Sequence, residues 1–211
     1  MRPKIFDFDP VDVDADGISE AQTPAWAGNL DIDGALTSGG VAVLDYARQL
    51  VITSDGNDSG VTFTVTGTDA DGHAQTEAIT GPNATTAEST KYFKTITQIA
   101  ISGAGTGNIT VGTVDELVSQ SIPIDHYSDL NCAITLDITG TINYSVQESK
   151  SDIQSLSSAT QSAVWYDITA FSGKTADVVS TANQGARAIR FLVNSYSSGA
   201  EAQMYISQPT R

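Results

Sequence analysis

VTFTVTGTDADGHAQTEAITG, residues 61–81, is the stretch that decides the fold, together with KYFKTITQIAISGAGTGNITVGTV, residues 91–114. In the first segment Val61, Phe63 and Val65 alternate with threonines. Side chains that alternate in this way point to opposite faces of a strand, one face buried and one solvated. The segment therefore predicts a half-buried β-strand.

Turn residues separate this strand from further strands. Asp71-Gly72 predicts a tight turn, because Gly tolerates a positive φ and Asp bonds its own backbone. The run at 76–80 then returns as the second strand of a hairpin. The glycine-rich run 103–108 predicts a looser hairpin between 99–101 and 109–111. Strands and turns in this order are typical of an antiparallel β-sandwich.

The composition favours the same fold class. The chain has 211 residues, of which 40% are hydrophobic and only 17% are charged, and it contains 18 glycines. β-Branched residues suit a pleated surface, whereas a helical chain of this length needs more Leu, Glu, Lys and Arg. This length is enough for one large or two small domains, and each half carries its own strand and turn signals.

We therefore predict an all-β protein with two antiparallel β-sandwich domains, jelly-roll or Ig-like, preceded by an extended acidic N-terminal arm. The arm covers residues 1–35, the first sandwich 36–118 and the second 124–208. The joint lies at Ser119–Pro123, where the proline keeps the preceding residue extended. A short helix around Asp45–Gln49 is an alternative to strand at that point.

The predicted arm has eight acidic residues and, after Lys4, no base until Arg48. Like charges at this density do not collapse alone. Its apolar residues, among them Phe6 and Phe8, alternate with acids, which indicates an extended segment that orders against a surface. That surface is its own domain, a neighbouring subunit or a larger assembly. Trp26 is the candidate anchor, because Trp buries a large area at one point; Phe6, Phe8 and Trp26 are thus the candidate partner-binding residues.

Within the arm, Asp12, Asp14 and Asp16 precede a glycine in a DxDxDG pattern, which makes them candidate calcium ligands. A full EF-hand loop places a bidentate Glu at the twelfth position, where this chain has Thr23. A linear DxDxDG can still gather calcium in β-rich proteins. The alternative is a solvated acidic segment that holds no metal, and with it we expect no cofactor.

The overall charge restricts the partners. The balance of 25 acidic to 10 basic residues gives a formal net charge of -15. Such a surface repels nucleic-acid phosphates and anionic bilayers, so we expect neither nucleic acid nor membrane as a partner. The single cysteine, Cys132, cannot form an intrachain disulfide and fits a small buried residue. No signal peptide opens the chain, so we expect synthesis in a cytoplasm.

Residues that could carry out catalysis are few. No nucleophile-elbow, zinc-protease, P-loop or dinucleotide-binding motif occurs. Asp69, Asp71 and Glu77 cluster near His73, and a carboxylate pair of this kind could hydrolyse a polysaccharide. Acids at a hairpin tip are usually turn residues, however. His126 is a lone loop histidine. We therefore predict no enzymatic activity.

Two stretches resemble proteins of tailed-bacteriophage particles. The first, from TFTVTGTDADGHAQTEAITGPN to NITVGTV, is similar to β-rich phage structural modules in its order of strand, DxDG turn, strand, GP loop and IxxI strand. The second comprises INYSVQESKSDI and the run from VWYDITAFSG to AQMYISQ. It is similar to phage modules with a long loop, a central tryptophan, here Trp165, and an AIR strand. The resemblance covers roughly residues 60–208 and leaves out the acidic arm.

The resemblance implies a virion component without enzymatic activity. Such proteins include capsid decoration (cement) proteins, head–tail joining proteins and short fibres. Cement proteins are small, often trimeric, and commonly reach neighbouring subunits with an extended N-terminal arm. We therefore expect a decoration protein that stabilises the capsid exterior, with the major capsid protein and copies of itself in a homotrimer as partners.

Two other functions are compatible with the sequence. A host-attachment tip or sugar-binding module would expose aromatic side chains on loops. A polysaccharide-degrading enzyme would need the carboxylates near the 71–72 turn. The segment containing Trp26 and the one containing Trp165 both have the pattern of packing sites, which favours the structural role.

Overall fold

The structure is a computed structural model that describes residues 4–124, 132–153, 163–183 and 185–208. These residues form an all-β protein with antiparallel sheets, as the composition predicted. The one helical element among them is the 3-10 turn Thr169–Phe171. The alternative of a helix around Asp45–Gln49 is wrong, because a strand runs through these residues from Val41 to Ser54.

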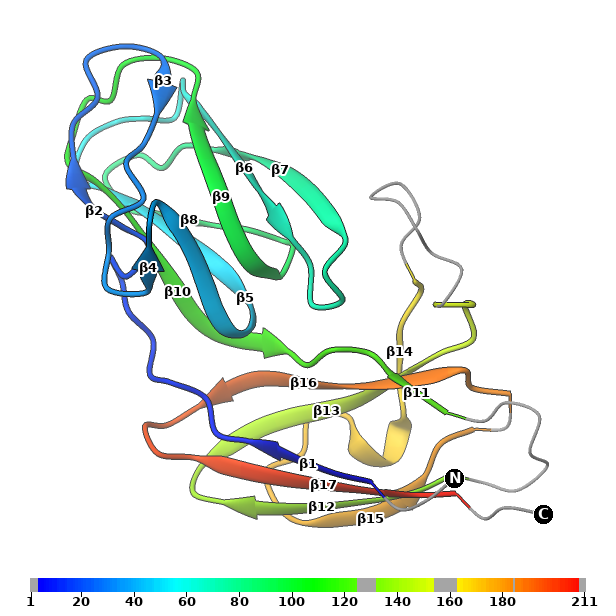
Figure 1. Ribbon diagram of the computed structural model, residues 1–211. Helices are drawn as coiled ribbons and strands as arrows, with labels where there is room; N and C mark the ends of the chain where they lie inside the picture. The colour runs from blue at the N-terminus through cyan, green and yellow to red at the C-terminus, as the bar shows by residue number, and fades with distance from the viewer. Residues whose placement is uncertain (1–3, 125–131, 154–162, 184, 209–211) are drawn as a thin grey trace. The chain divides into compact units, whose positions relative to one another are not determined.

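The chain divides into two compact units (Figure 1). Unit 1 consists of Met1–Asp12 with Val118–Arg211, and unit 2 of Val13–Leu117. Unit 2 ends at Leu117, and the predicted first sandwich ends at 118. The predicted arm, in contrast, is shared between the two units.

Unit 2 is built on a sheet in which the long strand β5 pairs on both sides. The main strands follow the order β10-β5-β9-β6-β7: β10 (Ile109–Val118), β5 (Val41–Ser54), β9 (Phe93–Ile101), β6 (Thr62–Thr68) and β7 (Ala74–Thr80). Four short strands pair with them: β2 (Ser19–Gln22) with β10, β3 (Gly28–Asn29) with β9, and β4 (Thr37–Ser38) and β8 (Thr86–Glu88) with β5.

The hairpin of β6 and β7 forms as predicted, with Phe63 opposite Ile79 and Val65 opposite Glu77. Gly72 has a φ of +84° in the turn. The Asp69 carboxylate accepts hydrogen bonds from the backbone N–H groups of Asp71 and His73, both at 2.9 Å. The aspartate thus caps the turn, which is the role that the DxDG pattern suggests.

The core of unit 2 includes residues of the acidic segment. Ile18 is fully buried and Leu30 is 4% exposed, both in one cluster with Phe63 and Ile99. Around them pack further apolar residues of the main strands, listed here as Leu44, Leu50, Ile52, Val65, Phe93, Ile96, Ile109 and Val111. Apolar residues spaced within an acidic segment therefore decide its position.

Backbone hydrogen bonds fix residues 13–35 on the sheet. Ile18 N–H donates to the carbonyl of Val111 at 3.0 Å, and Leu30 N–H to that of Ile99 at 2.8 Å. Thr113 N–H donates to the carbonyl of Asp14 at 2.9 Å. The sequence did not decide which surface the arm lies against. For residues 13–35 the structure shows that this surface is the sheet of unit 2.

Gly112 of β10 permits this close approach. A Cβ atom at position 112 would lie 2.1 Å from the carbonyl oxygen of Asp14 and 2.5 Å from that of Ala15. Both are backbone atoms, so they cannot rotate away as the end of a flexible side chain would.

We predict that Gly112→Ala lowers the free energy of unfolding by roughly 2–4 kcal/mol, because the segment after Asp14 must leave the sheet. Urea unfolding followed by circular dichroism measures it. Gly28→Ala is the matched control, since its Cβ would meet nothing within 4 Å, and it should change the free energy by less than about 1 kcal/mol. Equal effects of the two substitutions would contradict the prediction.

The middle of β5 is irregular. Its register with β9 shifts between Val43 and Arg48. The ammonium group of Lys94 donates to the carbonyl oxygens of Leu44 at 2.5 Å and Asp45 at 2.8 Å. A side chain of β9 thus satisfies carbonyls at the point where the ladder is interrupted.

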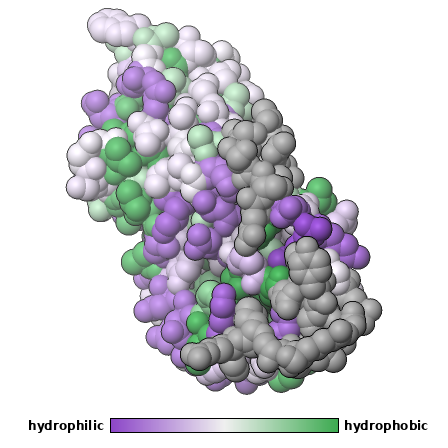
Figure 2. Space-filling model, turned by 45° about the vertical axis from the view of Figure 1, so that its right-hand side comes forward, coloured by the Kyte–Doolittle hydropathy of each residue, from purple (hydrophilic) through white to green (hydrophobic). Residues whose placement is uncertain are grey.

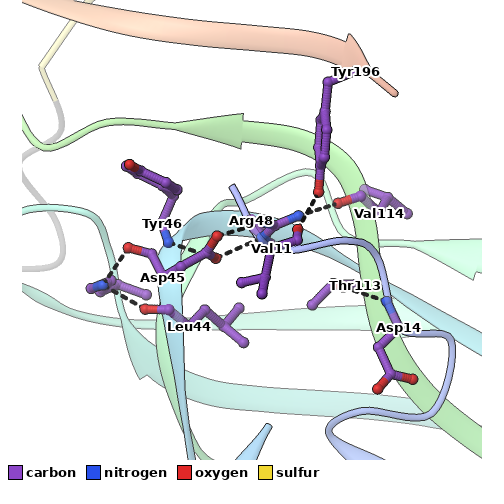
Figure 3. Close-up of polar contacts among 10 residues, drawn as sticks. Val11, Asp14, Leu44, Asp45, Tyr46, Arg48, Thr113, Val114 and Tyr196 are labelled. Atoms are coloured by element: carbon purple, nitrogen blue, oxygen red, sulfur yellow. Dashed lines mark hydrogen bonds and ion pairs between the residues drawn. The ribbon is translucent and has the colours of Figure 1, made fainter. Parts of the chain in front are cut away.

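Arg48 lies at the same irregularity and is 1% exposed (Figure 3). Its guanidinium donates twice to the Asp45 carboxylate, at 2.9 Å and 2.7 Å, and once to the carbonyl of Val114 at 3.4 Å. The bidentate pair compensates the buried positive charge.

Unit 1 consists of two sheets. The four-stranded sheet has the order β1-β17-β12-β15: β1 (Lys4–Phe8), β17 (Glu201–Ser207), β12 (Ala133–Thr139) and β15 (Val178–Thr181). The other strands follow the order β14-β13-β16, with β11 also on β16: β14 (Tyr166–Asp167), β13 (Ile142–Ser149), β16 (Ala188–Tyr196) and β11 (Ile122–Pro123).

Aromatic side chains join the two sheets of unit 1. The ring of Phe8 on β1 lies 4.4 Å from that of Phe191 on β16, and Phe191 lies 5.3 Å from Tyr144 on β13. All three are buried. The sheets therefore pack face to face in a sandwich-like arrangement, to which the start of the predicted arm contributes the strand β1.

Tyr144 makes this core sensitive to alkaline pH. Its hydroxyl group donates to the carbonyl of Ala176 at 2.8 Å. Burial, and after it the negative charge of Asp177, raise the pKa of Tyr144 to about 12. Burial disfavours the phenolate, so the folded state retains the proton at a pH where an unfolded tyrosine has lost it.

We predict that this stabilisation is complete below pH 10 and disappears as the pH rises from 10 to about 12. The two-unit difference corresponds to about 3 kcal/mol of unfolding free energy. In Tyr144→Phe, the decrease of unfolding free energy across this range should be shallower by up to that amount. Urea unfolding at several pH values measures it, and an unchanged slope would contradict the assignment.

Candidate interaction surfaces

The outer face of the four-stranded sheet in unit 1 carries a row of apolar side chains. Strand register places Ile5 opposite Tyr205, Tyr205 opposite Thr135, and Thr135 opposite Val179. The four side chains point to the same face, because directly paired residues share a face of the sheet. We call this set, Ile5, Tyr205, Thr135 and Val179, the outer row.

The outer row is exposed to solvent. Val179 is 74% exposed, Ile5 58% and Tyr205 36%. Their strand neighbours on the opposite face, such as Met204 and Leu136, are fully buried in the core. Single exposed apolar residues are common on protein surfaces. Figure 2 shows hydrophobic residues among hydrophilic ones on the side of the molecule that it draws. Three in register across one sheet are informative, because aligned apolar groups form a contact surface.

An acidic row lies beside the outer row. Asp7 pairs with Gln203, and Gln203 with Asp137. Both carboxylates are exposed. Gln203 accepts a hydrogen bond from the Tyr205 hydroxyl at 2.6 Å, which connects the two rows. One step further, Glu201 pairs with Thr139. The outer face therefore combines apolar and negatively charged side chains.

A second candidate surface is the loop that carries Trp26, between β2 and β3 in unit 2 (Figure 1). Trp26 is 76% exposed. The loop is fixed to the neighbouring 103–108 loop, where Gly105 N–H donates to the carbonyl of Pro24 at 2.8 Å. Thr23 also donates to the side chain of Asn108 at 3.0 Å. The tryptophan is thus presented from an ordered loop.

Two aspartates hold the same end of unit 2 in place. Asp58 is fully buried, and its carboxylate accepts hydrogen bonds from the Ser54 hydroxyl at 2.5 Å and the Thr106 N–H at 2.8 Å. The Asp55 carboxylate accepts from the Asn108 N–H at 2.6 Å. These bonds tie residues 55–58 to the glycine-rich run 103–108, so the carboxylates have structural roles.

The sequence context predicted that Trp165 packs in the core. In the structure its side chain is only half-buried. The Arg190 guanidinium carbon lies 4.5 Å from the centre of the Trp165 ring, in a cation–π contact. Its neighbours Val164 and Tyr166 are 55% and 60% exposed. Arg190 is held by Gln147, whose side-chain oxygen accepts from the guanidinium at 2.7 Å. The contact with arginine explains how an indole ring lies at the surface.

The three predicted partner-binding residues have different positions. Phe8 is 4% exposed and packs on Phe191, so its prediction as a partner contact is wrong: it belongs to the core of unit 1. Phe6 is half-buried on β1, opposite Met204. Trp26 is exposed and remains a candidate contact.

The candidate calcium ligands do not come together. Asp12, in unit 1, accepts a hydrogen bond from the Ser198 hydroxyl at 2.7 Å. Asp14, in unit 2, accepts from the Asp16 N–H at 3.3 Å. Across the described ranges, no group of three or more His, Cys, Asp or Glu side chains is placed to hold a metal ion. The carboxylates of Asp12 and Asp14 bind protein donors instead.

The carboxylates near the 71–72 turn also bind the protein itself. Glu77 accepts hydrogen bonds from the Thr90 N–H at 2.7 Å and the Lys91 N–H at 3.0 Å. His73 lies 3.3 Å from Asp69, whose carboxylate caps the turn. These hydrogen bonds stabilise the turn and the neighbouring loop. His126 lies outside the described residues.

Cys132 is buried, as predicted. Burial raises the pKa of its thiol to about 11. The thiolate is the nucleophilic form, so at neutral pH the side chain is a protonated, unreactive group.

The chain matches no protein-family model, and neither the curated proteins nor the solved structures include a significant match. Within the described residues, none of the elements is a helix with the length and apolarity that a membrane crossing needs. The candidate surfaces therefore rest on the geometry of this chain alone. The outer row could not be predicted from the sequence, because its members lie on four segments that are far apart in the chain.

Proposed function

We propose that this protein is a non-enzymatic structural component of a tailed-phage particle, which binds the capsid exterior as a decoration (cement) protein. Three points support the proposal: the resemblance of residues 60–208 to phage structural modules, the all-β fold, and the outer row. The major capsid protein is the proposed partner, copies of this chain forming a homotrimer on it. In this proposal each unit is a β-sandwich of the jelly-roll or Ig-like kind.

The outer row is the observation that carries the proposal. A rigid sheet that holds Ile5, Tyr205 and Val179 in register offers a preformed contact surface, so little conformational entropy is lost on binding. A stable pairwise interface buries about 800 Å² per partner, and the row alone supplies only part of this. A decoration protein can bind through a contact of this small area, because many copies of the contact on one symmetric particle act together.

We predict that Val179→Ser weakens binding to capsids roughly tenfold, because a buried valine side chain contributes about 1.5 kcal/mol or more. The measurement is cosedimentation of purified protein with capsids of the encoding phage that lack this chain. Val43→Ser is the matched control, since Val43 is 62% exposed but lies on β5 of unit 2. Failure of the unaltered protein to cosediment would refute decoration.

The same contact would serve a head–tail joining protein. Electron microscopy of gold-labelled protein on the particles separates the two roles: label over the whole head supports decoration, and label at one vertex supports joining.

A host-attachment or sugar-binding role is the second candidate, and Trp26 is the observation that favours it. An exposed aromatic ring on an ordered loop is the feature that such a module requires, and the sequence had indicated packing instead. A ring in this position offers a flat apolar surface to a ligand.

For this role, we predict that host-cell polysaccharide changes the tryptophan fluorescence of the unaltered protein and of Trp165→Phe, but not of Trp26→Ala. Trp26→Ala should keep its melting temperature within about 1–2 °C, because an exposed side chain contributes little to stability. Fluorescence titration and thermal unfolding measure the two effects. A response that survives in Trp26→Ala excludes this loop as the site.

A further inference from the structure

We infer that the open edge of strand β15 takes an extended segment of the docking partner, which adds to the four-stranded sheet of unit 1 as a further strand. The inference rests on the proposed docking role of the outer row and adds the mode of binding and the kind of segment that binds. It follows from the direction in which the backbone groups of β15 point.

β15 is an edge strand that pairs on one side. It lies at one end of the strand order β1-β17-β12-β15 (Figure 1). Ala182 N–H donates to the carbonyl of Cys132 at 3.0 Å, and the register with β12 continues from there through Ser180. Bonded and non-bonded residues alternate along an antiparallel ladder. Ser180 therefore bonds to β12, whereas the N–H and C=O groups of Val179 and Thr181 point away from it.

These outward backbone groups are open to a partner. Val179 is 74% exposed, and Thr181 is exposed as well. In the part of the chain that the structure describes, no strand pairs with the outer side of β15. Two N–H and two C=O groups that alternate along one edge match the backbone of another extended strand, which is how proteins recognise a segment by strand addition.

The sequence of β15 does not protect this edge. Native edge strands are commonly blocked by a lysine, a proline or a bulge. Val178–Thr181 reads VVST, without charge or proline, and its register with β12 is unbroken. The edge strand β7 of unit 2 is different, because the Lys91 ammonium group donates to the Thr76 carbonyl at 2.8 Å. The edge of β7 is thus partly covered by the chain itself, and that of β15 is left open.

Continuity with the outer row indicates which partner supplies the strand. Val179 belongs both to the outer row and to the open edge, so a protein that covers the row also reaches the edge. The added segment must be extended and must have no proline where its N–H groups face β15. Uncharged β-branched residues fit best, because their neighbours on β15 are valine, serine and threonine.

Thr181→Pro tests the inference, because proline has no N–H group to donate to an added strand. Thr181→Ala is the matched control, since it removes the same side chain and retains the N–H group. In cosedimentation with capsids that lack this chain, we expect Thr181→Pro to bind at least tenfold more weakly than Thr181→Ala, because the proline ring removes a hydrogen bond and obstructs the added strand. Equal binding of the two variants overturns the inference.

Ser180→Pro checks the direction of the backbone groups. Proline is tolerated where the N–H of an edge strand faces solvent, so Thr181→Pro should keep its melting temperature within about 2 °C. Ser180→Pro removes an N–H group that bonds to β12 and should lower the melting temperature by at least about 5 °C. Thermal unfolding measures both. Equal losses would show that the Thr181 N–H group also bonds within the sheet, and would overturn the inference.

A synthetic probe tests the edge on the unaltered full-length protein without capsids. The probe is a peptide of about six residues that alternates Thr and Val, slightly longer than β15. Its control has the same sequence with a methyl group on every backbone nitrogen. Each peptide is titrated into isotope-labelled protein while amide exchange is recorded. We expect the probe to slow exchange at Val179 and Thr181 roughly fivefold or more, and the methylated peptide to have no effect. Unchanged exchange at these two amides overturns the inference.

These tests are separate from the test of decoration. If the unaltered protein does not cosediment with capsids and the peptide protects Val179 and Thr181, decoration fails while strand addition to β15 stands. If capsids bind and Thr181→Pro binds as well as Thr181→Ala, strand addition is wrong while decoration stands.

Discussion

Two cationic side chains hold the irregular middle of β5, and the sheet of unit 2 depends on this strand because β4, β8, β9 and β10 all pair with it. Lys94 satisfies two carbonyls where the ladder with β9 breaks, and Arg48 extends from the same break to Val114. A buried guanidinium without a partner would cost several kcal/mol. Asp45 removes that cost by binding it with both oxygens (Figure 3). The sequence therefore encodes the irregularity, because in a regular strand the carbonyls that Lys94 binds would pair with the neighbouring strand.

Local patterns in the sequence were enough to predict the parts of the fold that depend on neighbouring residues. The alternation from Val61 to Val65 and the turn at Asp71-Gly72 predicted the β6–β7 hairpin, because both the face of each side chain and the turn are set within a few residues. The segment before residue 36 was predicted as a separate arm because its charge density dominated the interpretation. Its position is instead decided by Ile18 and Leu30, which reach core positions across long separations in sequence.

The candidate surface could not be predicted, for a related reason. Its members lie on β1, β12, β15 and β17, and only the register between distant strands brings them into one row. A valine such as Val179 has the same pattern in the sequence whether it faces the core or solvent, since a one-residue change in register exchanges the two faces. Trp26 shows the converse problem: its large apolar ring suggested burial, whereas its loop is held by backbone and polar contacts that leave the ring outside. Composition and turn residues are therefore enough to predict the fold class, whereas the candidate surface depends on pairing between distant strands.

The pairing of β1 with β17 has a consequence for the order in which the protein folds during synthesis. Unit 2 consists of residues 13–117, so this unit can fold while the residues that follow it are still being synthesised. Strand β1 is synthesised before unit 2, whereas its partner strand, residues 201–207, is synthesised after it. Lys4–Phe8 must therefore wait as an unpaired strand until nearly two hundred further residues have been added. Strand β1 precedes unit 2 in the chain, but it can take its place in unit 1 only after unit 2 has been synthesised.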